Sequence, residues 1–264
     1  MKKVRLFIAG AFVLGALASC EKEDITTNDD SSTQENATKN MVSTGNGGSL
    51  AQFTIVDDHL YTIDYKTLNI FSLSDPDNPQ KTESIDMGIG METVFHENGR
   101  LFIGANDGVH IYDITEPRNP QEISTFQHVT SCDPVIANEN YALATLRGGT
   151  ECGGSLSELD VISISDIYNP ELIGSVELNN PYGLGFSNVD ANIVYVCDGF
   201  DGLKAYSIAN PGNPKLLMTY DNLEAMDVIA QENDNLIVLS REGIYQFDAS
   251  NPTQLNQNSF IPVQ

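Results

Sequence analysis

The chain has 264 residues, with 13 basic and 37 acidic side chains and a formal net charge of −24 at pH 7. A field of this sign repels phosphate groups and anionic lipid, so the composition argues against nucleic-acid binding. It suits cations, cationic partners or high solubility.

The first twenty residues, MKKVRLFIAGAFVLGALASC, have the three parts of a bacterial lipoprotein signal. Three basic residues near the start precede an apolar run from Leu6 to Ala18, which is shorter than the roughly 20 residues that cross a bilayer. Small residues then lead to Cys20. We predict that residues 1–19 are a cleaved signal peptide and that acyl chains on Cys20 anchor the protein. An ordinary secretory signal with an incidental cysteine is the alternative.

Residues 20–48 begin with the lipidated cysteine and continue as a polar stretch with few large apolar side chains. Such a stretch buries too little surface to offset the entropy of ordering it, so we expect a disordered tether. Lys22-Glu23-Asp24 resembles the short signal that sends lipoproteins of Bacteroidetes-type bacteria to the cell surface. We therefore expect an outer-membrane lipoprotein exposed at the cell surface, with a generic solvated tether as the alternative for these three residues.

Residues 49–264 contain five repeats, each marked by an Asn-Pro pair. The pairs are Asn78-Pro79, Asn119-Pro120, Asn169-Pro170, Asn213-Pro214 and Asn251-Pro252. Their spacing is close to the length of a four-stranded propeller blade. A strand-like segment precedes each pair and a β-rich run follows it, although the last run, Thr253 to Val263, is more polar. Because proline lacks an N–H donor, each pair is expected in a turn.

A hairpin precedes each of these strand pairs, most clearly from Val94 to Ile103, where Asn98-Gly99 supplies a tight turn. Four strands, which we name A to D, therefore make one repeat. No sustained helical periodicity appears after the signal. We predict an all-β fold, a five-bladed β-propeller with no strand left to exchange between the two ends; a solenoid or an open sandwich is the alternative.

The repeats resemble a known family. Val109-His110-Ile111-Tyr112-Asp113-Ile114 and Leu203-Lys204-Ala205-Tyr206-Ser207-Ile208, each followed by Asn-Pro, are similar to the LVIVD repeat of bacterial surface or secreted propellers. Segments such as Asn180-Pro181-Tyr182-Gly183-Leu184-Gly185 resemble its lipoprotein branch. The resemblance implies a propeller fold and a location outside the cytoplasm, and it brings no catalytic residues.

Three cysteines remain after Cys20. Cys132 is expected in the D-to-A connection before the third blade and Cys152 in that blade's long B-to-C connection, and both connections emerge at one end of a blade. Because an exported protein can form disulfides, we predict a Cys132–Cys152 bond, with metal ligation as the alternative. Cys197 ends a B strand and is expected to be a buried apolar residue.

Three carboxylates suggest a cation site. An ungapped alignment of the repeats places Glu92, Asp133 and Asp227 at one position, at the start of an innermost strand, with Tyr182 near the equivalent place in the fourth repeat. Converging carboxylates suit calcium or magnesium, so we predict a divalent-cation site at the channel mouth. A polar, water-filled channel without a bound ion is the alternative.

The loops at the same end are expected to form a ligand-binding face that includes Arg147, Tyr182, Asp198 and Asp201. The Asp-Gly sequences there also fit ordinary turns, which is the alternative for Asp198 and Asp201. The four histidines, at positions 59, 96, 110 and 128, share no catalytic spacing and are expected to be structural or exposed.

Three functions follow from these features. The first is a membrane-anchored binding module for a protein or glycan ligand, and the chain shows no feature that would bind nucleic acid. The second is an extracellular lyase or hydrolase that uses the channel carboxylates and a cation. The third is a structural subunit of an envelope complex.

Overall fold

The computed structural model describes residues 48–88, 90–128, 134–149, 154–231 and 233–263. This part of the chain contains twenty β-strands in five antiparallel sheets of four strands, and it contains no helix. It accordingly holds no helix that could span a membrane. The predicted fold class, five blades of four strands in a propeller arrangement, is confirmed. The signal peptide, Cys20 and the tether up to residue 47 lie outside the described residues.

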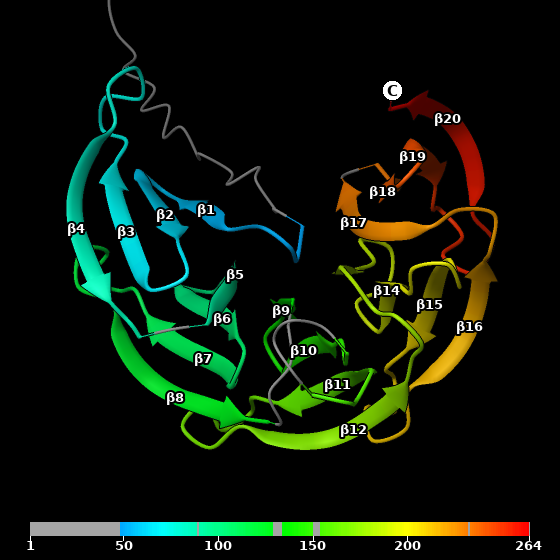
Figure 1. Cartoon of the computed structure of the whole chain (residues 1–264), viewed down its shortest axis with the longest axis horizontal. Helices are drawn as coiled ribbons and strands as arrows, with labels where there is room; N and C mark the ends of the chain where they lie inside the picture. Colours follow the sequence, from blue (N-terminus) through cyan, green and yellow to red (C-terminus); the bar gives the residue numbers. More distant parts are fainter. Residues whose placement is uncertain (1–47, 89, 129–133, 150–153, 232, 264) are drawn as a thin grey trace, which may run out of the picture. The chain divides into compact units, whose positions relative to one another are not determined.

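Every blade is built from four strands in chain order, without exchange between the ends (Figure 1). Blades 1 and 2 comprise β1 (Phe53–Val56), β2 (His59–Ile63), β3 (Thr67–Ser72), β4 (Gln80–Asp86), β5 (Met91–Glu97), β6 (Arg100–Ala105), β7 (Gly108–Asp113) and β8 (Gln121–Gln127). Blades 3 and 4 comprise β9 (Val135–Ala137), β10 (Tyr141–Leu146), β11 (Glu158–Ser163), β12 (Glu171–Glu177), β13 (Leu184–Phe186), β14 (Ile193–Cys197), β15 (Leu203–Ser207) and β16 (Lys215–Tyr220). Blade 5 comprises β17 (Ala225–Gln231), β18 (Asn235–Ser240), β19 (Gly243–Asp248) and β20 (Asn256–Pro262).

The hairpin turns explain why the A and B strands pair in the predicted register. Asn98 and Gly99 both have positive φ, 47° and 70°, as a two-residue hairpin turn of the primed type requires. The turn sets Glu97 opposite Arg100 and Phe95 opposite Phe102. We call the end of the blades with these A–B turns the bottom end, and the end with the B–C and D–A connections the top end.

The Asn-Pro pairs lie in the C–D turns, as predicted, but the fifth pair is shifted. In the first turn the Asn78 N–H donates to the Asp75 carbonyl oxygen, and the turns of blades 2 to 4 repeat this bond. In blade 5 the Gln254 N–H donates to the carbonyl of Asn251. Asn251 therefore begins its turn, whereas the asparagines of the other four pairs end theirs. Aligning Asn251-Pro252 with the other pairs was wrong by three residues.

The outer strands carry the same irregularity in every blade. The register between strands C and D shifts by one residue near the middle of each pair, for example between Ile70 and Phe71 in blade 1 and between Gln246 and Phe247 in blade 5. Such a bulge bends and twists the strand that contains it. The five outer strands β4, β8, β12, β16 and β20 curve along the rim in Figure 1.

Four apolar cores join the blades. Each core combines side chains of two consecutive blades, for example Val94 and Leu101 of blade 2 with Tyr61 and Ile70 of blade 1. The other cores join blade 2 to 3, blade 3 to 4 and blade 4 to 5. Within the residues that the structure describes, no core joins blade 5 to blade 1. Burial therefore falls off at the two ends of the blade series.

Candidate functional site

The top end holds the first part of the predicted ligand face. The Arg147 guanidinium carbon lies 4.2 Å from the centroid of the Tyr182 ring, a cation–π distance. Thr145, which is buried, donates a hydrogen bond of 2.6 Å from its hydroxyl to the Tyr182 carbonyl oxygen. The structure thus brings Arg147 of blade 3 and Tyr182 of the next blade together, and their role in a ligand face stays a prediction.

Asp198 and Asp201 form a second cluster in blade 4. The Asp198 carboxylate is fully buried and accepts N–H bonds from Asn179 (3.1 and 3.3 Å) and Asn180 (2.7 Å). The Lys204 ammonium lies 2.5 Å from Asp198 and 3.7 Å from Asp201. Partial burial lowers the pKa of Lys204, but the contact with Asp198 outweighs it, so the pKa is raised.

These contacts give the two aspartates different roles. Asp198 holds the connection between blades 3 and 4 and presents no oxygen at the surface, so the expectation that it contributes to a ligand face is not supported by its position. Asp201 is more exposed, and it accepts a hydrogen bond from the Asn179 side-chain amide. Exposed Phe200 lies between them on the same turn.

Asp227 lies where the N-terminal segment meets blades 4 and 5. The Ser49 hydroxyl donates to Asp227 at 3.5 Å and accepts the Leu184 N–H at 2.7 Å. Two glycines allow the backbone to approach the carboxylate closely. A Cβ at Gly48 would lie 2.3 Å from one carboxylate oxygen, and a Cβ at Gly183 would lie 2.1 Å from the other. Burial raises the pKa of Asp227 to about 6, although hydrogen bonds from the Val228 N–H and Ser49 lower it.

The predicted equivalence of the three carboxylates is corrected by the strand registers. Glu92 is the extra residue of a bulge, and Thr93 pairs with Gly104. In blade 5 the extra residue is Met226, and Asp227 takes the position of Thr93. Asp227 therefore lies one residue beyond the position of Glu92. Aligning the strands without a gap misplaced it.

The cation site itself stays a prediction. Asp133 lies outside the described residues, so its distance from Glu92 is not part of the structure. Among the residues that are described, no group of three His, Cys, Asp or Glu side chains could hold a metal ion. Enzymatic use of these carboxylates also stays a prediction.

The predicted disulfide falls on Cys132 and Cys152, which both lie outside the described residues. The two arms of the loop that carries Cys152 are close, since the Gly149 N–H donates to the Gly154 carbonyl oxygen at 3.2 Å and the Gly148 N–H to the Ser157 hydroxyl at 3.2 Å. Cys197 is buried, as expected, and burial raises the pKa of its thiol.

The histidines at positions 59, 96 and 110 make local contacts. His59 is buried with Nδ1 2.7 Å from the neighbouring Asp58 carboxylate, and His110 lies 3.1 Å from Asp107. His96 accepts the Gly99 N–H of its own hairpin turn, and burial lowers its pKa. Each contact stays within one blade.

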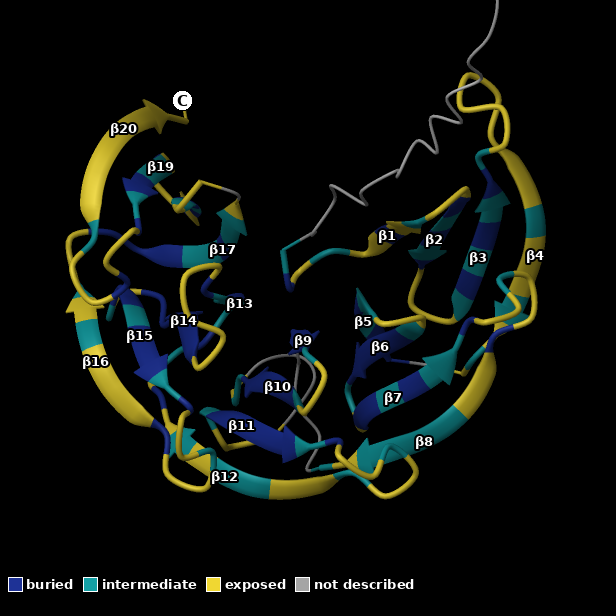
Figure 2. Cartoon of the chain, turned by 180° about the vertical axis from the view of Figure 1, so that it is seen from behind, coloured by how far each residue is buried: buried dark blue, intermediate teal, exposed yellow. Residues whose placement is uncertain are grey.

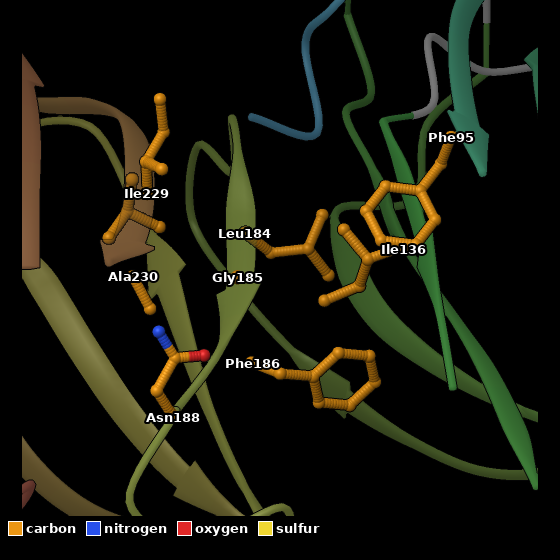
Figure 3. A pocket seen from close by; sticks show the side chains of 9 residues that line it. Phe95, Ile136, Leu184, Gly185, Phe186, Asn188, Ile229 and Ala230 are labelled. Atoms are coloured by element: carbon orange, nitrogen blue, oxygen red, sulfur yellow. The ribbon is translucent and has the colours of Figure 1, made fainter. Parts of the chain in front are cut away.

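A small pocket lies between the innermost strands of four blades. Its volume is about 60 Å³, it is partly open to solvent, and polar atoms supply nearly half of its surface. Its lining side chains are almost all apolar, and Figure 3 shows those of β5, β9 and β13 turned toward one another, with those of β17 across β13: Phe95, Ile136, Leu184, Phe186, Ile229 and Ala230. Asn188, in the turn after β13, is the polar residue of the lining and places the pocket toward the bottom end.

Two carboxylates lie at this end. Glu97 follows Phe95 by two residues on β5 and so leaves the strand on the same side. Burial and the nearby Glu139 carboxylate raise the pKa of Glu97. The bottom end therefore combines an apolar pocket with negative charge.

Neither the pocket nor the contact of Ser49 with Asp227 was predicted from the sequence. The lining includes two runs of consecutive residues, Leu184 to Phe186 and Val228 to Ala230, so no alternating pattern in the sequence marks it. Ser49 carries no motif, because its role depends on a fold that brings it next to residues 135 and 178 positions away.

Comparison with known proteins adds support for the fold. No protein-family profile and no curated protein sequence matches the chain. A protein of unknown function from Desulfotomaculum acetoxidans is similar in structure (TM-score 0.63, 13% identity, 80% of this chain and 69% of that one). A protein from Lactobacillus plantarum is also similar (TM-score 0.66, 14% identity, 79% of this chain and 70% of that one). The periplasmic gluconolactonase of Pseudomonas aeruginosa is similar as well (TM-score 0.61, 14% identity, 80% of this chain and 72% of that one).

Fold and likeness together place the chain among the β-propeller proteins. At 13–14% identity the likeness shows the fold alone. Membership of the LVIVD-repeat family stays a prediction.

Proposed function

We propose that the protein is an exported lipoprotein, anchored through Cys20 in the outer membrane, whose propeller is a binding module at the cell surface. The observation that supports binding is the apolar pocket between the innermost strands. Preformed concave sites lined by apolar side chains, with few polar groups, are the usual form of ligand sites in proteins.

The chemistry of the pocket favours an amphipathic ligand group. Its walls suit an aliphatic or aromatic body, and the carboxylates of Glu97 and Glu139 at the same end suit a positive charge. A lysine or arginine side chain of a protein partner has this form, an apolar stem with a cationic head. A neutral glycan could donate hydroxyl hydrogen bonds to these carboxylates but would gain no charge attraction.

Methyl NMR tests this site with two probes of matched size, benzylamine and benzyl alcohol. Both are expected to shift the methyl signals of Ile136, Leu184 and Ile229, and benzylamine is expected to bind more tightly. Ala230→Trp should fill the pocket and abolish the shifts, whereas Ala191→Trp, on an exposed turn, should leave them unchanged. Equal shifts in both variants would contradict the proposed site.

Anchoring is tested separately. Cys20→Ser should leave the precursor uncleaved or release the protein from the membrane fraction, and it should remove labelling by an alkyne fatty acid. Labelling that persists in Cys20→Ser would contradict the anchor and leave the pocket proposal standing.

A further inference from the structure

The segment that leads into the first blade also contacts blades 2, 4 and 5. We call residues 48–52 the strap. The Ser49 hydroxyl accepts the Leu184 N–H of blade 4 at 2.7 Å, and the Ala51 carbonyl oxygen accepts the Val94 N–H of blade 2 at 2.9 Å. Ser49 is 1% exposed, and Figure 2 shows the buried start of the strap before the more exposed β1. The strap is therefore docked on the top end and is more than a connection into β1.

In blade 5 the strap covers the carboxylate of Asp227. Gly48 of the strap and Gly183 of blade 4 approach this carboxylate so closely that a Cβ on either glycine would lie within 2.3 Å of an oxygen. The Ser49 hydroxyl at 3.5 Å and the Val228 N–H at 2.9 Å donate hydrogen bonds to it. Within the described residues, no lysine, arginine or histidine forms an ion pair with Asp227. The carboxylate has thus lost water without gaining a cation.

The described elements packed against Asp227 bring no charge that offsets its own. The strap and the strands β13, β17 and β18 hold no other titratable side chain. The remaining titratable groups nearby are two tyrosines, a thiol and an ion pair, namely Tyr182, Tyr195, Cys197 and Glu224 with Arg241. Burial, Asp227 and Asp198 raise the pKa of the Cys197 thiol, so it stays neutral. Asp227 is therefore the group at the strap whose charge changes between acid and neutral pH.

The strap takes part in the burial that disfavours the charged carboxylate. Loss of water raises the energy of a charged carboxylate more than that of a protonated one. Burial accordingly raises the pKa of Asp227 to about 6, against smaller opposing effects of the Val228 N–H and Ser49. When the strap lifts, water reaches the oxygen that Gly48 covers. Opening of the strap therefore favours the ionised form of Asp227.

We propose that the strap and Asp227 form a pH-dependent clasp on the top end of the propeller. The strap stays docked while the carboxylate is protonated and opens more often once it is ionised, which exposes the starts of β13 and β17. Between pH 3.8 and about 6 the docked state binds more protons than the open state, so docking is strongest below about pH 4 and weakens as the pH rises through 6. The clasp does not depend on the ligand of the pocket.

The size of the effect has an upper bound. The pKa of Asp227 is about 6 in the docked state, and its ordinary value of 3.8 applies when water surrounds the carboxylate. Because these two values differ by about 2, the ratio of open to docked molecules can change by at most about 100-fold. Blade 4 keeps covering part of the carboxylate in the open state, so we expect a change of about 10- to 100-fold.

Amide hydrogen exchange measures the opening directly. The Leu184 and Val94 N–H groups bond to the strap, whereas the Ser187 N–H bonds to the Ile193 carbonyl oxygen at the bottom end of blade 4. After correction for the intrinsic pH dependence of exchange, the open fraction at Leu184 and Val94 should rise by this factor from pH 4 to 7.5, with little change at Ser187. No rise, or an equal rise at Ser187, would overturn the clasp.

Two substitutions isolate the carboxylate. Asp227→Asn keeps an oxygen acceptor without an ionisable group, so exchange at Leu184 should lose its pH dependence and the strap should stay docked at pH 7.5. Glu224→Gln is the matched control, because Glu224 is also buried at the top end, at 5% exposed, but is paired with Arg241. This control should keep the pH dependence of the parent. If Asp227→Asn kept it too, or Glu224→Gln lost it, the clasp would not be Asp227.

Ser49→Ala tests the strap side of the clasp and does not depend on how Asp227→Asn folds. It removes the hydroxyl that accepts the Leu184 N–H, so exchange at Leu184 should be faster at every pH. The increase with pH should remain, because Asp227 is still present. Unchanged exchange at Leu184, or exchange that no longer varies with pH, would contradict the proposal.

Discussion

Ser49 and Asp227 meet across 178 residues of sequence, with the serine hydroxyl 3.5 Å from the aspartate carboxylate. The contact joins the start of the described chain to the innermost strand of the last blade. Ser49 also accepts the Leu184 N–H, so one small side chain links the N-terminal segment to blades 4 and 5. The Val94 N–H donates to the carbonyl of Ala51, which links the same segment to blade 2.

Asp227→Asn is expected to stabilise the protein at neutral pH. The folded-state pKa of Asp227 is about 6, above its ordinary value of 3.8. Between these values the folded state binds more protons than the unfolded state, so stability falls as pH rises through this window. Asparagine keeps an oxygen acceptor without the buried charge. We expect a gain of about 2 kcal/mol at pH 7.5 that disappears below pH 4.

Urea unfolding of both proteins from pH 3.5 to 8 measures this difference. Asp221→Asn, an exposed aspartate, serves as the control and should show no such pH dependence. A difference between Asp227→Asn and the parent that does not change with pH would show that burial of the charge is not its cause.

The Arg147–Tyr182 contact is expected to stabilise the join between blades 3 and 4 through the ring rather than the phenol group. Tyr182→Phe keeps the ring beneath the guanidinium and should change the free energy of unfolding little. Tyr182→Leu removes it and should cost about 0.5–1 kcal/mol. Chemical denaturation compares the two variants, and equal losses in both would assign the effect to the hydroxyl.

Much of the fold could be predicted because its signals are local. The turn at Asn98-Gly99 and the alternation from Val94 to Ile103 fix a hairpin from neighbouring residues alone. The errors arose where one repeat has more residues than another. Three residues separate Gln231 from Asn235, whereas two separate Glu97 from Arg100, and this difference displaces Asp227 by one position in an alignment without gaps.

The site was predicted less well because its contacts join distant segments. Asp198 looked like a turn residue, and its burial depends on Asn179 and Asn180 folding back from the preceding connection. The exposure of Phe53 and Ile244 was not predicted either. The strand of Ile244 did hold a partial signal, because Gln246 stands where the equivalent strands carry buried Ile70 and Ile111.

The disulfide between Cys132 and Cys152 is expected to stabilise the protein without being needed for the fold. Closing a loop of about 20 residues contributes roughly 3 kcal/mol in the chain-entropy model. Reduction, or Cys152→Ser, should therefore lower the melting temperature and leave the circular dichroism spectrum unchanged. Mass spectrometry that finds free thiols at both positions in the exported protein would exclude the bond.

The ion pair of Asp198 and Lys204 is expected to act as one structural unit. Asp198→Ala leaves two backbone N–H groups without their acceptor, and Lys204→Met leaves a fully buried carboxylate without its cation. Breaking a buried pair on one side typically costs about 3–5 kcal/mol. The two single variants should each lose roughly this much, and the double variant should lose clearly less than their sum.

A double-mutant cycle by urea unfolding measures the coupling, which we expect to exceed about 1 kcal/mol. Asp201→Ala is the matched control, because this carboxylate is 3.7 Å from the same ammonium but 42% exposed. Water screens such a pair, so its loss should be under about 1 kcal/mol. Additive losses at Asp198 and Lys204 would mean that the backbone N–H groups alone stabilise the buried carboxylate, and that Lys204 contributes only through the packing of its stem.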